Sequence, residues 1–129
     1  MKSPKAICTA NDTPDDGREA LRPMASLIGK SEKAQRKLAK GTWQHAMLRD
    51  NLQALHMATA LMTKGAGAGG RIAPGDLREA LRAFASMIGK TEKAKAKFPP
   101  GTSHHTLQRN RLKALRMAGA VIQAELDKR

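Results

Sequence analysis

With 129 residues, of which 40% are hydrophobic, the chain is long enough for one domain, and its single cysteine excludes a framework of internal disulfides. The 24 lysines and arginines outnumber 11 acidic residues, so the formal net charge is +13. Such a charge favours anionic partners, namely nucleic acid, acidic protein surfaces or anionic lipid.

The first residues lack the apolar run of roughly seven to fifteen residues that a secretory signal requires. Residues 1–12 mix proline, threonine, asparagine and aspartate with few apolar residues, which predicts a flexible N-terminal tail that contains Cys8. No window reaches the length needed to span a membrane. We therefore expect a cytoplasmic protein that does not insert into membranes.

The remainder of the chain repeats itself. Residues 18–62 align without a gap to residues 78–122, and 24 of these 45 positions carry the identical amino acid. We divide the chain into repeat 1 at residues 13–64, a Gly-rich linker at 65–75 and repeat 2 at 76–129. Because each copy is too small to bury a sizeable core alone, we expect both repeats to form one domain.

A helix is predicted at the start of each repeat. In repeat 1 it begins near residues 13–16, where Asp16 followed by Glu19 resembles a capping box, and Asp76 with Glu79 resembles the same motif in repeat 2. Pro23 would remove one hydrogen bond from the first of these helices, so we expect a kink there.

In repeat 2 an apolar stripe with alternating steps of four and three residues predicts an amphipathic helix of roughly 23 residues. The stripe consists of Leu77, Leu81, Phe84, Ile88, Thr91, Lys95 and Phe98.

Each predicted first helix ends at a turn that contains a glycine, Gly41 or Gly101, which suits a left-handed exit from the helix. Thr42, and Thr102 or Ser103, can cap the helix that follows. These second helices again carry apolar stripes, formed by Leu48, Leu52, Leu55, Thr59 and Met62 in repeat 1 and by Leu112, Leu115, Gly119, Ile122 and Leu126 in repeat 2.

Two helical hairpins with matching stripes can bury them by packing on each other. The sequence therefore predicts an all-α fold, in which a tandem duplicated helical hairpin forms a pseudo-two-fold four-helix bundle. Because the Gly-rich linker is slack, the hairpins can also exchange between chains, so both a monomer and a hairpin-exchanged dimer fit the sequence.

Basic residues recur at helical spacing in both repeats. Rows of this kind meet phosphate backbones, because each cation that neutralises a phosphate releases counterions. The predicted nucleic-acid or anion-binding residues are Lys30, Lys33, Lys37, Lys90, Lys93, Lys97, Arg109, Lys113 and Arg116. The simpler interpretation is that these rows are the solvated faces of an ordinary basic bundle.

Other chemistries find less support in the sequence. Recognition by base stacking is disfavoured, because Phe84 and Phe98 fall on an apolar stripe and leave Trp43 as the one remaining aromatic side chain. His45 and His105 follow the capping threonines by three residues, where an imidazole can bond back to the turn. Further ligands at defined spacing are lacking, so we expect neither a metal nor a cofactor.

No constellation of nucleophile and base can be drawn, so we expect no enzymatic activity. The leading hypothesis is a small basic binding module that contacts nucleic-acid backbone without strong sequence specificity. The alternative is a protein interaction or assembly module, which binds an acidic partner or exchanges hairpins. A metal site built on the histidines is the third and weakest hypothesis.

Overall fold

The computed structural model describes residues 14–64 and 72–128, with the side chains described over 19–63 and 72–128. These residues form four α-helices and no strand, which confirms the predicted all-α class. The predicted N-terminal tail and most of the Gly-rich linker lie outside the described residues. The helices are α1 (Pro14–Arg36), α2 (Trp43–Lys64), α4 (Pro74–Ala96) and α5 (Ser103–Asp127).

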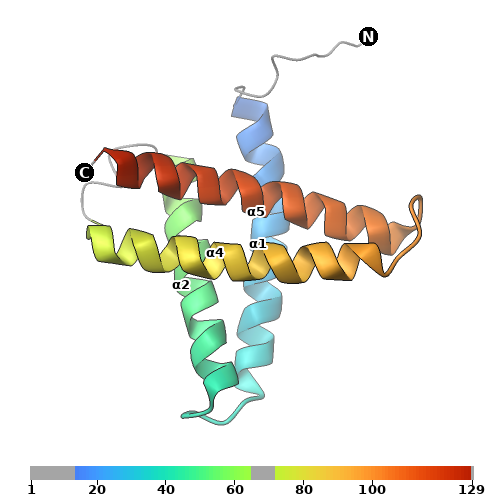
Figure 1. Ribbon diagram of the computed structural model, residues 1–129, viewed down its shortest axis with the longest axis horizontal. Coiled ribbons are helices and arrows are strands. Elements are labelled where there is room, and N and C mark those ends of the chain that lie inside the picture. The colour runs from blue at the N-terminus through green and yellow to red at the C-terminus, as the bar shows by residue number, and fades with distance from the viewer. Residues whose placement is uncertain (1–13, 65–71, 129) are drawn as a thin grey trace.

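The helices form a four-helix bundle of two hairpins that lie in two layers (Figure 1). Helices α4 and α5 lie side by side in the layer nearer the viewer, and α1 and α2 run steeply across them behind. Helix α1 packs on α5, while α2 contacts both α4 and α5. No helix within the described ranges combines the length and apolarity needed to cross a membrane.

The core lies where the two layers cross, and every helix contributes a fully buried side chain to it. Met24, Leu55 and Leu115 are each 0% exposed and Phe84 is 1% exposed. Burial of one such side chain stabilises the fold by about 1.5–3 kcal/mol. The predicted stripes are confirmed at Leu55, Phe84 and Leu115. Thr91 is also buried, and its hydroxyl donates to the Met87 carbonyl at 2.8 Å.

The predicted capping box of repeat 2 is wrong. Helix α4 begins at Pro74, so Ala73 is the N-cap residue and no side chain caps the helix. Proline is well suited to the first helical position, where its missing N–H is not needed and its φ is already helical. Asp76 therefore lies inside the first turn, and Glu79 forms an ion pair with Arg82 at 2.9 Å.

In repeat 1 the corresponding residue, Asp16, likewise lies within α1, although its side chain is outside the described set. Helix α1 continues through Pro23 without interruption. The kink expected at Pro23 stays a prediction.

The turns and their caps are confirmed. Gly41 and Gly101 have φ angles of 93° and 91°, in the left-handed region that side chains disfavour. The backbone N–H of His45 donates to Thr42 Oγ1 at 3.3 Å, and that of His105 donates to Thr102 Oγ1 at 3.2 Å. Each threonine thus satisfies a backbone donor that the first helical turn would leave free.

The same substitution is expected to have opposite effects at two glycines of the second hairpin. At Gly101 an alanine would be forced into the left-handed region, which lowers the free energy of unfolding by about 1 kcal/mol. At Gly89, inside α4, an added Cβ meets nothing within 4 Å, so Gly89→Ala should raise the free energy of unfolding by about 0.5–1 kcal/mol. Urea unfolding followed by circular dichroism measures both changes, and equal signs would contradict the turn geometry.

Candidate nucleic-acid interface

All nine predicted cationic residues are exposed, but they do not form one continuous row. Lys30 and Lys33 lie on α1 and Lys37 directly follows it, in the first hairpin. The other six lie in the second hairpin, on α4, on α5 or, for Lys97, directly after α4. The turns of the two hairpins lie at different ends of the crossed layers (Figure 1). The cations of α1 and those of α4 therefore extend toward separate ends of the molecule.

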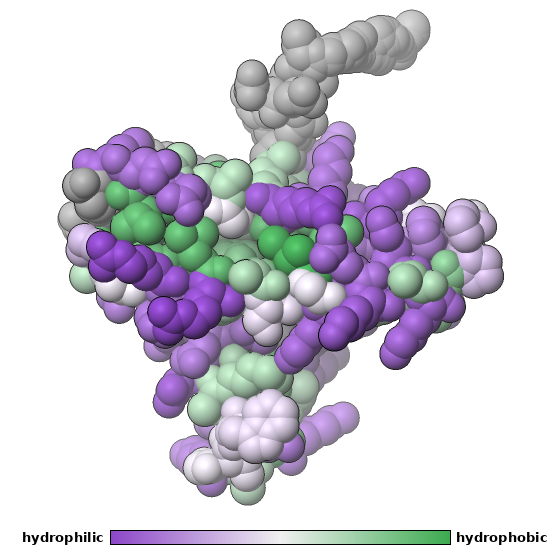
Figure 2. Space-filling model, viewed as in Figure 1, coloured by the Kyte–Doolittle hydropathy of each residue, from purple (hydrophilic) through white to green (hydrophobic). Residues whose placement is uncertain are grey.

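The second hairpin, formed by α4 and α5, carries most of the predicted residues. Hydrophilic side chains cover the half of the α4–α5 layer that carries the turn between these helices (Figure 2). Arg116 Nη2 lies 2.6 Å from Glu92 Oε2, so an ion pair joins α5 to α4 on the surface of this hairpin. The eight remaining cations make no ion pair with any carboxylate of the described residues.

One cation also connects α4 with α2. Lys90 Nζ lies 3.0 Å from Met47 Sδ, although 43 residues separate them in the chain. Thioether sulfur is a weak acceptor, so this contact leaves the ammonium group available for a stronger, anionic partner.

The layer crossing leaves two grooves at equivalent positions of the repeats. The groove between α1 and α5 has a volume of about 430 Å³ and is lined by polar residues that include Glu19, Arg22, Asn110 and Lys113. Its counterpart between α2 and α4 has a volume of about 810 Å³, and its charged lining residues include Arg49, Asp50, Asp76 and Glu79. At equivalent positions, Lys113 corresponds to Gln53 and Asn110 to Asp50, so the first groove is more basic than the second.

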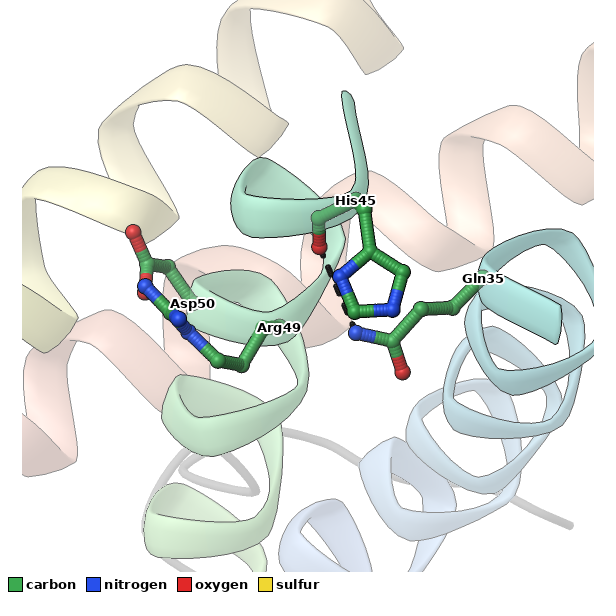
Figure 3. A network of polar contacts seen from close by, with 4 residues as sticks. All are labelled: Gln35, His45, Arg49 and Asp50. Atoms are coloured by element: carbon green, nitrogen blue, oxygen red, sulfur yellow. Dashed lines mark hydrogen bonds and ion pairs between the residues drawn. The ribbon is translucent and has the colours of Figure 1, made fainter. Parts of the chain in front are cut away.

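His45 takes part in a contact between the two helices of the first hairpin (Figure 3). Gln35 Nε2 donates to the His45 carbonyl at 3.3 Å and thereby ties α1 to α2. The expected bond from the imidazole back to the turn is absent among the described residues, and the bond from His45 to Thr42 Oγ1 comes from its backbone N–H. On the other side of α2, Arg49 pairs with Asp50 at 3.4 Å.

The histidines of the second hairpin have a similar structural role. His104 stacks on Phe98, with ring centroids 4.9 Å apart, and so closes the turn between α4 and α5. Within residues 19–63 and 72–128, no three side chains among histidine, cysteine, aspartate and glutamate gather closely enough to hold a metal ion.

Arg111 is the least expected residue of α5. It is only 8% exposed, and its buried Nε has no hydrogen-bond partner. Desolvation lowers the pKa of this guanidinium from its usual value. The burial of Arg111 could have been predicted from the helical spacing, because it precedes the buried Leu115 by four residues and therefore falls on the apolar stripe.

Two further residues, Trp43 and Asn51, were not predicted from the sequence as site residues. Trp43 is 70% exposed at the start of α2, and Asn51 is 9% exposed on the same helix. Neither residue belongs to a distinctive sequence pattern, because the surroundings of both depend on how α4 crosses α2.

The chain matches no protein-family model, and neither a curated protein nor a solved structure proved similar to it.

Replacement of Arg111 by methionine is expected to raise the free energy of unfolding by about 1 kcal/mol. The substitution keeps an apolar stem and removes a buried N–H whose desolvation is not repaid. Arg109→Met, on the exposed side of α5, is the matched control and should change stability by less than about 0.5 kcal/mol. A loss of stability in Arg111→Met, measured by urea unfolding, would show that the guanidinium has a stabilising partner.

Proposed function

We propose that this protein is a small basic binding module that contacts the phosphate backbone of nucleic acid without strong sequence specificity. The observation that carries the proposal is the set of eight exposed cations that have no carboxylate partner among the described residues. Cations that stay unpaired in the folded chain can neutralise phosphates without first breaking an ion pair.

The second hairpin is the better candidate for the main contact. It carries Lys90, Lys93, Lys97, Arg109, Lys113 and Arg116, six of the nine predicted residues. The hydrophilic half of the α4–α5 layer offers a surface for these contacts (Figure 2). Lys30, Lys33 and Lys37 belong to the first hairpin and would reach a different part of a long nucleic acid.

We also infer that the two hairpins are copies related by an approximate two-fold axis. Helices α1 and α4 begin 60 residues apart and so do α2 and α5, which is the offset of the sequence repeat. Buried positions recur at the same offset, as Leu55 and Leu115 illustrate. The contacts of α1 with α5 and of α2 with α4 fit the same relation. Such symmetry would give the two hairpins similar basic surfaces.

The alternative function, an interaction module for an acidic protein or for hairpin exchange, would use the same free cations. The two functions differ in their response to duplex nucleic acid at low salt. Contact with about five phosphates gives a slope near −4.5 in a plot of log affinity against log salt concentration. Absence of binding to duplex DNA and RNA at low salt would discard the nucleic-acid function in favour of an acidic protein partner.

Neutralisation of Lys93 and Lys97 tests the proposed surface. The double variant Lys93→Gln/Lys97→Gln removes two phosphate contacts, so the salt slope should become shallower by about 1.8. Lys33→Gln/Lys37→Gln changes the equivalent positions of repeat 1 and measures how much the first hairpin contributes to the slope. Fluorescence polarisation with labelled duplexes measures both slopes. Equal slopes for the wild type and the Lys93/Lys97 variant would contradict an interface on the second hairpin.

A further inference from the structure

We propose that a third groove, between α2 and α4, binds two successive unpaired nucleotides of single-stranded DNA or RNA. The inference rests on the proposed function and extends it from contact with backbone to recognition of unpaired bases. It depends on Trp43, Asn51 and Lys90, which the fold brings to one place.

Trp43 supplies an exposed aromatic face. It is the first residue of α2 and is 70% exposed, so folding leaves most of its apolar surface in water. A base that stacks on such a ring gains binding free energy whatever its identity, since every base has a π-face. The equivalent residue of repeat 2 is Ser103, so only the first repeat offers this ring.

The groove beside Trp43 has a volume of about 360 Å³, within the range of roughly 300–1,000 Å³ of small-ligand sites. Its lining includes Ala46 and Met47 from α2 and Ala83 and Ser86 from α4. Apolar side chains from both layers thus line the groove next to the indole.

Two carboxylates also line this groove, and each lies close to an arginine. Asp50 pairs with Arg49 at 3.4 Å, and Glu79 pairs with Arg82 at 2.9 Å. This pairing reduces the repulsion that a phosphate would otherwise meet at the groove.

Asn51 provides a polar group for a base edge. Asn51 lines the groove, and no hydrogen bond joins its side chain to any described residue. Although the residue is only 9% exposed, its amide atoms are not sealed from solvent, so a group bound in the groove can reach them. An amide offers both donors and an acceptor, as recognition of an unpaired base requires. Repeat 2 has Arg111 at this position.

Spacing places these groups along one side of α2. Trp43, Met47 and Asn51 follow one another at steps of four residues, so about 12 Å of helix axis separates the first from the last. Trp43 and Asn51 therefore serve different nucleotides. Lys90 Nζ lies 3.0 Å from the Met47 sulfur, between them, where it can bind the connecting phosphate.

The site selects single strands, because bases inside a duplex are paired and stacked and cannot reach the indole or the amide. From Lys90 the cationic row continues to Lys93 on α4 and then to Lys97, which directly follows the helix. A strand held in the groove can thus continue onto the proposed backbone-binding surface.

The fluorescence of Trp43 tests the inference directly, because the chain contains one tryptophan and no tyrosine. We expect oligo(dT) and oligo(rU) to quench this fluorescence, whereas a duplex of equal length leaves it unchanged. Trp43→Ala should weaken single-strand affinity by about 5- to 150-fold, the range that corresponds to loss of one stacked base, and change duplex affinity less than about twofold. Comparison of the two oligomers shows whether DNA or RNA is preferred.

Two further variants separate stacking from general surface effects. Leu107→Ala truncates another exposed apolar residue, at the position equivalent to Met47, and should leave single-strand affinity unchanged. Trp43→Ala/Ser103→Trp moves the indole to the other hairpin, away from Asn51 and its groove, where it should not restore the affinity that Trp43→Ala loses. Circular dichroism confirms that each variant is folded.

The outcomes distinguish this inference from the proposed function. Duplex binding with the predicted salt slope, but without quenching by either single strand, would overturn the nucleotide site and leave the backbone-binding function in place. Single-strand affinity that is unchanged in Trp43→Ala would also overturn the site. If neither duplex nor single strand binds at low salt, both proposals fail, and the exposed indole then points to a protein interface.

Discussion

The structure depends on burial of one hairpin's apolar face by the other. A single pair of helices leaves its inner stripe in water, and neither repeat has enough residues to cover that stripe itself. The crossing of the layers solves this problem, because Met24, Leu55, Phe84 and Leu115 meet there with almost no exposed surface. At Gly119 of α5 an added Cβ would lie 3.9 Å from the Phe84 Cβ of α4, an ordinary van der Waals contact within the second hairpin.

The two repeats share core residues such as Leu55 and Leu115 and exposed residues such as Lys30 and Lys90, and they differ at positions of both kinds. Core positions are coupled across the crossing, so a change in one hairpin must suit the other. Surface positions are free of that constraint, and there Trp43 corresponds to Ser103 and Gln53 to Lys113. The proposed nucleotide site uses the groove beside Trp43, which lies between α2 of repeat 1 and α4 of repeat 2.

Much of the fold could be predicted from the sequence because its causes are local. Apolar periodicity indicated the buried faces, and Gly101 with Thr102 indicated where one helix ends and the next begins. The capping box failed for an equally local reason, since the preference of Pro74 for the first helical position outweighed the preference of Asp76 for the cap.

The candidate site was less predictable, because it depends on the angle at which the layers cross. Helical spacing identified the exposed cations, but it could not show that Lys90 meets Met47 while Lys37 lies on another arm. Nor could it show that Asn51 lines a groove, since half of that groove belongs to a helix distant in sequence. The proposed nucleotide site differs from the rest of the surface in the exposure of Trp43 and in the groove beside it, and neither follows from the sequence pattern.

The central claim, that the hairpins share one interior, is tested most directly by hydrogen exchange resolved along the chain in Leu55→Ala and Leu115→Ala. Each substitution removes a fully buried side chain from one hairpin and should cost about 2–5 kcal/mol. If the interior is shared, either substitution speeds exchange of the slowest amides in both hairpins to a similar degree. Exchange that accelerates only in the substituted hairpin, with full protection kept in the other, would contradict the claim.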